Sequence, residues 1–263
     1  AAQVLMITPT ASNPAVTQGR PFVFRTCLVD TDQAQVMASC AVKDMGLLAG
    51  AVLFDAGDAY SRGLAGYFRD FYTSLGGRMV LFEGYPPETK DFSGLMARVR
   101  ASGAKLLYLP NFPRALRQQM VQARAAGFSG VFMGADSWDE DRSLHALAQM
   151  QGALFTADYY PGGVSARARE ELDGYAAVLG EPMDKNTVLT LDSVGLILAA
   201  AGKARSLSPA DLREALLGLQ GYEGLTGHIT FLPEGDPDRS VHVLKVAQGR
   251  TELVKVVERG QPQ

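Results

Sequence analysis

The sequence lacks the features that would mark it for a membrane or a nucleic acid. Its 25 basic and 28 acidic residues nearly cancel to a net charge of −3, and they form no basic stripe. Nucleic acid and anionic lipid are therefore poor partners. The apolar run at Val188–Ala201 is broken by Asp192 and is shorter than the roughly 20 residues that a membrane helix needs.

Residues for metal and nucleophile chemistry are also scarce. The chain has two cysteines, Cys27 and Cys40, and three histidines that lie far apart in the sequence. A zinc site needs four ligands at short spacings, so we expect neither a metal nor a cofactor. No nucleophile elbow, Walker A sequence, H-E-x-x-H or G-x-G-x-x-G occurs. The absence of these motifs favours a binding protein over an enzyme. A disulfide between Cys27 and Cys40 would join a strand end to the middle of the next helix, where we expect a Cα separation above the roughly 7 Å that a disulfide permits, so we expect two buried or half-buried free thiols.

The middle of the chain alternates short apolar runs with segments of helical period. This alternation, with strands that are apolar throughout, is typical of a parallel sheet covered on both faces. The spacing of Leu64, Phe68 and Tyr72 predicts one of the intervening helices. The predicted strands are Gly50–Asp55, Met79–Glu83, Lys105–Pro110 and Gly130–Ala135.

The flanking regions follow a different pattern. Two short strands and a helix opened by Asp30, with Gln33 placed for a capping box, precede the parallel region. After Ser165 the sequence becomes helical, with Ser208 as one helix cap. It closes with two alternating segments around Gln248–Arg250, which predict a hairpin.

Polar and aromatic residues follow the predicted strands at their carboxyl ends. Open α/β sheets bind ligands at that edge, so we expect Tyr60, Phe112 and Asp136 to converge there. Asp136 could pair with an ammonium group while the rings cover an apolar tail. Alternatively, Asp136 only caps the helix that begins near Trp138.

A second candidate site lies at the start of the chain, in Val4–Thr17. An apolar strand leads into a polar turn and then into a helix with Pro14 at its first position and Ser12 or Asn13 as its cap. Free N–H groups and the helix dipole would favour a carboxylate or phosphate there. The same pattern also fits an ordinary capped turn.

Several sequence blocks, taken in their order along the chain, resemble those of the periplasmic leucine/isoleucine/valine-binding proteins of ABC importers. The most specific are Y-x-x-G-L-A at Tyr60–Ala65, K-D-F-S at Lys90–Ser93 and G-x-T-G-x-I-x-F at Gly224–Phe231. The resemblance spans nearly the whole chain. It implies an α/β, type I periplasmic-binding-protein fold, with two doubly wound parallel-sheet lobes joined by a hinge and closing on an amino acid.

The resemblance also implies roles for individual residues. The backbone carbonyl of Thr10 would accept a hydrogen bond from the ligand's ammonium group. Ser12, next to Ala11, would bind the ligand's carboxylate through its hydroxyl and its backbone amide. Tyr60 would reach the ligand from the second lobe. Phe112 stands where the family has a tyrosine and Asp136 where branched-chain binders have a glutamate, so side-chain selectivity is left open.

The front of lobe one is the main departure from the family, because about a hundred residues expected there are absent from this sequence. We therefore expect an incomplete lobe one, from residues 1–46 and 159–240, and a lobe two from residues 47–158 and 241–263. Apolar faces left exposed would favour a homodimer. The resemblance further implies a periplasmic location and an inner-membrane ABC permease as partner. A ligand-sensing or scaffold domain of the same fold, regulating a partner protein, is the alternative.

Overall fold

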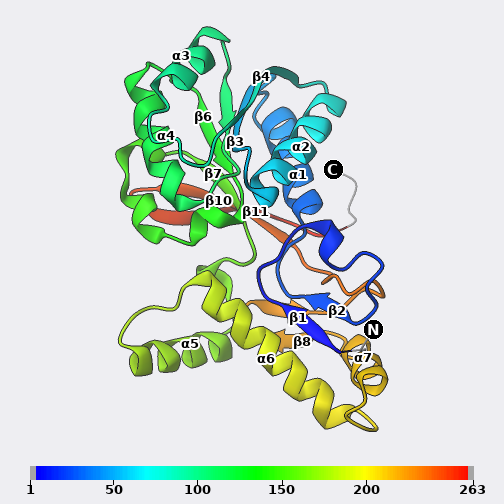
Figure 1. Cartoon of the computed structure of the whole chain (residues 1–263). Coiled ribbons are helices and arrows are strands. Elements are labelled where there is room, and N and C mark those ends of the chain that lie inside the picture. Colours follow the sequence, from blue (N-terminus) through cyan, green and yellow to red (C-terminus); the bar gives the residue numbers. More distant parts are fainter. Residues whose placement is uncertain (1–3, 260–263) are drawn as a thin grey trace. The chain divides into compact units, whose positions relative to one another are not determined.

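The computed structural model describes residues 4–259, which group into two compact units (Figure 1). The first contains the described residues up to Val29 together with Asp158–Ser240, and the second contains Asp30–Ala157 with the described residues from Val241 onward. Residues 30–46, which we assigned to lobe one, lie in the second unit. The reason is that helix α1 (Asp30–Ser39) packs against helix α2 (Ala59–Ser74) and against two strands of the second unit's sheet.

The second unit is built on a seven-stranded sheet in the order β11-β10-β7-β6-β5-β3-β4. Strands β3 to β7 are parallel, while β10 runs antiparallel to both of its neighbours, β7 and β11. The four predicted parallel strands and the C-terminal hairpin are confirmed. The strands are β3 (Ala49–Asp55), β4 (Arg78–Tyr85), β5 (Leu106–Tyr108), β6 (Val131–Gly134), β7 (Leu154–Ala157), β10 (Val241–Ala247) and β11 (Arg250–Val257).

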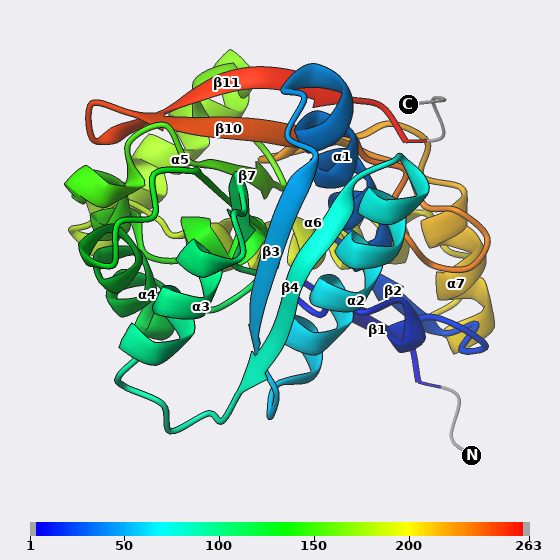
Figure 2. The same ribbon diagram turned by 90° about the horizontal axis from the view of Figure 1, so that it is seen from above.

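Helices cover both faces of this sheet, as its uniformly apolar strands require. Figure 2 shows α1 and α2 on one face, and α3 (Ser93–Ala101) and α4 (Pro113–Ala125) on the other. The chain runs from β3 outward to β4 and then crosses back to β5, so the winding direction reverses between β3 and β5. Ligand sites in open α/β sheets lie outside the carboxyl ends of the strands at such a reversal.

Short helical segments complete the second unit. They follow α1 or connect β6 to β7, and they are η2 (Cys40–Asp44), η3 (Asp136–Asp139), η4 (Arg142–Ala146) and η5 (Ala148–Met150).

The core of the second unit contains a stack of aromatic rings. The ring of Phe68 on α2 lies 4.0 Å from that of Tyr108 on β5 and 5.3 Å from that of Tyr72, and all three residues are fully buried. Aromatic stacking of this kind adds to the free energy gained by burying the rings. It fixes α2, and with it Tyr60 at the start of that helix, against the sheet.

The first unit combines small sheets with three longer helices. β1 (Met6–Thr8) and β2 (Val23–Arg25) form a parallel pair, and β8 (Tyr222–Gly224) and β9 (Gly227–Ile229) an antiparallel one. The longer helices are α5 (Ala166–Leu179), α6 (Lys185–Lys203) and α7 (Pro209–Leu217), with the short segments η1 (Pro14–Val16) and η6 (Pro161–Gly163). As predicted, Ser208 caps α7 by accepting a hydrogen bond from the Asp211 amide at 3.2 Å.

Part of the first unit's apolar surface is buried and part is exposed. Phe24 packs with Leu196 and Leu216 in one core cluster. On the exposed side of α6, Val194 keeps 48% and Leu198 67% of its surface accessible.

Neither Cys27 nor Cys40 forms a disulfide, and both are buried. Within residues 4–259 no cluster of three or more His, Cys, Asp or Glu residues could hold a metal ion. The helices of the same residues include none with the length and hydropathy of a membrane span.

Candidate functional site

The turn after β1 differs from the predicted helix start. Asn13, as predicted, caps the segment that begins at Pro14 by accepting a hydrogen bond from the Ala15 amide at 3.0 Å. However, that segment is a single three-residue 3₁₀ turn, which is too short to build a helix dipole of useful size. The Ala11 amide is also not free, because it donates to the Thr8 hydroxyl at 3.3 Å.

An arginine that the sequence analysis did not single out holds this turn in place. Arg25 on β2 is fully buried and donates to the backbone carbonyls of Ala11 and Asn13, each at 2.9 Å. Its Nε lies 2.7 Å from a carboxylate oxygen of Asp236, which also accepts a hydrogen bond from the Thr17 hydroxyl at 2.8 Å. Within the turn, Ser12 is buried and Thr10 is exposed.

In the second unit, the structure brings Tyr60, Phe112 and Asp136 together at the carboxyl ends of β3, β5 and β6. The Tyr60 hydroxyl donates to the Asp136 carboxylate at 2.8 Å and accepts a hydrogen bond from the Ser137 amide at 3.3 Å. The rings of Tyr60 and Phe112 lie 5.1 Å apart with an interplanar angle of 35°. The cluster therefore offers a carboxylate beside an aromatic wall.

Asp136 is the first residue of η3 and does not occupy the cap position that the alternative interpretation gave it. The cap position of η3 is Ala135, which makes no side-chain cap hydrogen bond. The Asp136 amide donates to the side-chain oxygen of Gln33 at 3.1 Å, and the hydroxyl of Thr156 donates to the same oxygen at 2.6 Å. Gln33, which belongs to α1, thus positions the start of η3, and the predicted capping box did not include this contact.

A second buried carboxylate, that of Asp30, acts on the same cluster. Burial raises the pKa of Tyr60 well above its ordinary value, and the negative charges of Asp136 and Asp30 raise it further. The pKa of Tyr108 is raised by the same three causes. Tyr60 therefore stays protonated at physiological pH, and the field around its hydroxyl favours a cation.

Other residues that follow the strands have structural roles. The buried side chain of Trp138 donates its indole N–H to the Leu109 carbonyl at 2.9 Å. The Asn111 amide donates to the Leu53 carbonyl at 2.9 Å and so ties β5 to β3. These contacts hold the strand ends that carry Phe112 and Asp136.

A family model and two curated relatives all match this chain over most of its length. The family model described as periplasmic binding protein matches residues 1–251. Leu/Ile/Val-binding protein homolog 3 of Brucella melitensis is 30% identical over 237 residues, which cover 89% of this chain and 63% of that protein. The leucine-specific-binding protein of Salmonella typhimurium is 31% identical over 240 residues, covering 89% of this chain and 63% of that one. This chain thus spans less than two thirds of the length of either relative.

Solved structures agree with these relatives. A leucine binding protein from Thermotoga maritima superposes with a TM-score of 0.89 at 28% identity, covering 98% of this chain and 74% of the other. The isoleucine-bound LivJ protein of Streptococcus pneumoniae shares the fold, with a TM-score of 0.85 at 21% identity over 97% and 73% of the two chains. These matches confirm the type I α/β fold and the resemblance to leucine/isoleucine/valine-binding proteins. The chain belongs to the periplasmic binding protein family.

Proposed function

We propose that this chain is an amino-acid-binding component of an ABC importer, and that Asp136 and Tyr60 bind the ligand's ammonium group. The observation that carries the proposal is the Tyr60–Asp136 hydrogen bond at 2.8 Å, in a cluster where the Asp30 charge also favours a cation. An ammonium group at this position would be stabilised by both carboxylates. Phe112 supplies an apolar wall for the ligand's side chain.

The turn of the first unit is proposed to bind the carboxylate. As the family resemblance implies, the hydroxyl and the amide of Ser12 would donate hydrogen bonds to the ligand's carboxylate. The carbonyl of Thr10 would accept a hydrogen bond from the ligand's ammonium group. The Ala11 amide already donates to Thr8, so its part is to hold the turn. The clamp by Arg25 supports this assignment, because a preorganised turn loses less entropy when a ligand binds.

Binding rather than catalysis, a periplasmic location and delivery to a membrane permease belong to the same proposal. Membership of the periplasmic binding protein family supports them, as do the names of the relatives, which are those of amino-acid-binding proteins. The exposed apolar side of α6 supports a homodimer as a further part of the proposal.

Calorimetry with the whole chain tests the assignment of Asp136. Asp136→Asn keeps the shape of the side chain but removes its charge, and we expect leucine binding to weaken by about 2–5 kcal/mol if the charge pair is desolvated. The analogue 4-methylpentanoate, which lacks the ammonium group, should bind both proteins alike.

Asp141→Asn is a matched control. Asp141 caps η4 through a hydrogen bond from the Ser143 amide at 3.0 Å, and asparagine can make the same bond. Unchanged leucine affinity in the Asp136 variant would show that the ammonium partner is wrongly assigned. Failure of the unaltered chain to bind leucine, isoleucine, valine or any other amino acid would instead favour a sensing or scaffold domain.

A further inference from the structure

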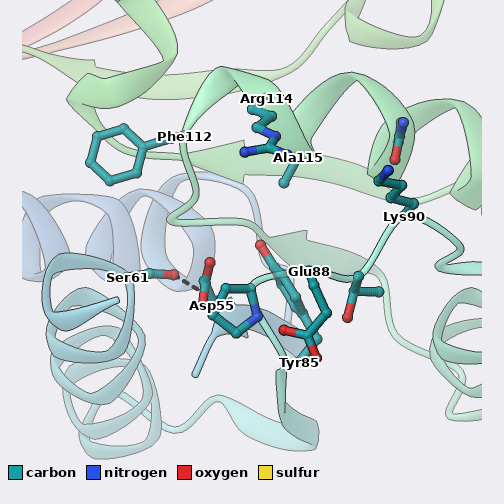
Figure 3. Close-up of a pocket in the computed structure, with 11 residues that line it drawn as sticks. Asp55, Ser61, Tyr85, Glu88, Lys90, Phe112, Arg114 and Ala115 are labelled. Carbon is teal, nitrogen blue, oxygen red and sulfur yellow. Dashed lines mark hydrogen bonds between the residues drawn. The ribbon is translucent and has the colours of Figure 1, made fainter. Parts of the chain in front are cut away.

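A pocket of about 300 Å³ lies in the second unit beside the Tyr60–Asp136 cluster (Figure 3). Its walls are the loop that follows β4 and the first turn of α4, together with Asp55 at the end of β3. Phe112 lines this pocket and also contacts Tyr60, so its ring lies between the pocket and the Tyr60–Asp136 cluster. The volume lies at the small end of the range for ligand pockets, which suits a metabolite of a few heavy atoms.

Tyr85, at the end of β4, forms a buried part of the pocket wall. It keeps only 2% of its surface accessible, and its hydroxyl interacts with the side chain of Gln119 on α4. Tyr85 thus ties the end of β4 to α4, and both of these elements contribute residues to the pocket wall.

Charges of opposite sign lie on opposite sides of the pocket. Figure 3 shows Arg114 and Lys90 along the α4 side, and Asp55 and Glu88 across from them. The first turn of α4, which begins at Pro113, adds the positive end of its helix dipole to the side that carries Arg114. A simple anion or cation would meet one favourable and one unfavourable wall, whereas a molecule carrying both charges would meet two favourable ones.

We propose that this pocket is a second binding site, for a small zwitterion of the free amino-acid class. Its carboxylate lies toward Arg114 and Lys90, and its ammonium toward Asp55 and Glu88. The apolar side chain of the ligand packs on Phe112. This site shares Phe112 with the first one but uses neither Asp136 nor the turn of the first unit, so the charged groups proposed to bind the ligand differ between the two sites.

The test follows backbone amide shifts by NMR while the whole chain is titrated with L-leucine. The reporters are Thr89 and Lys90 in the loop and Arg114 and Ala115 on α4. The titration is made in the Asp136→Asn background, which weakens the first site. We expect saturable shifts of these amides with leucine and much smaller ones with 4-methylpentanoate or 3-methylbutylamine, each of which lacks one of the two charges.

Arg114→Gln should weaken this leucine binding about tenfold, the effect of losing one charge-assisted hydrogen bond. Arg117→Gln is the matched control, because Arg117 lies on the same helix but bonds to Ser143 at 3.0 Å and does not line the pocket. Static reporter amides, equal shifts with either single-charge analogue, or equal affinity in the Arg114 and Arg117 variants would each overturn the proposal.

A failure of this site is distinguishable from a failure of the first one. Loss of the second site alone leaves the calorimetric effect of Asp136→Asn intact while the four reporter amides do not move. Loss of the first site alone leaves the reporter shifts in place while Asp136→Asn has no calorimetric effect.

Discussion

Removing the carboxylate of Asp236 should destabilise the first unit strongly. Its partner Arg25 is fully buried, and the bond between them is 2.7 Å long. Asp236→Ala leaves that guanidinium charge without its counter-charge in a site closed to water. Breaking one side of such a buried pair costs about 3–5 kcal/mol. At a urea m-value of about 2 kcal/mol/M, this corresponds to a midpoint lower by about 1.5–2.5 M.

Urea unfolding followed by far-UV circular dichroism measures this effect, because α5, α6 and α7 belong to the same unit as Asp236. Asp238→Ala is the control, since Asp238 lies two residues further on and is exposed. The free energy of unfolding of the Asp238 variant should change by no more than about 0.5 kcal/mol. If the two variants unfold at the same urea concentration, the Arg25 clamp does not have the stabilising role assigned to it.

Three further predictions concern single residues. Burial raises the pKa of the Cys40 thiol to about 11. Ellman's reagent at pH 8 should therefore label Cys40 slowly in the folded chain and rapidly in urea. Fast labelling of the folded chain would contradict this. Burial lowers the pKa of His145 below its unfolded value near 6.5, so its neutral form is favoured by folding, and stability should fall as pH drops below about 6.5. The urea midpoint should therefore decline less between pH 7 and pH 5 in His145→Asn than in the unaltered chain, and equal declines would rule this out. Leu198→Lys should reduce self-association measured by sedimentation without lowering thermal stability, because Leu198 is 67% exposed; unchanged association would show that α6 is not the contact surface.

The parallel sheet could be predicted because its signals are local. Each of its four predicted strands is a short apolar run bounded by turn residues, and the observed β3 and β6 differ from the predicted ranges only at their ends. The convergence of Tyr60, Phe112 and Asp136 followed from the same pattern, since parallel strands place their carboxyl ends at one edge. The fold and the proximity of these three residues could thus be predicted from the sequence alone.

The contacts that hold the site were not accessible in this way. Arg25 and Asp236 are separated by 211 positions, and Gln33 reaches residues 103 and 123 positions away. No periodicity or spacing rule connects residues so distant in sequence. Gln33 also carried a plausible local role as part of a capping box, and the tertiary contact to Asp136 replaced it.

The position of β10 in the second unit's sheet has a consequence for how the protein is made. β10 pairs with β7, although the whole helical part of the first unit intervenes between them in the chain. During translation, β7 must therefore emerge from the ribosome long before the strand that covers its edge. An uncovered strand edge can pair with other nascent chains. Chaperone protection of this edge until Val241–Val257 has been synthesised would keep the growing polypeptide from aggregating.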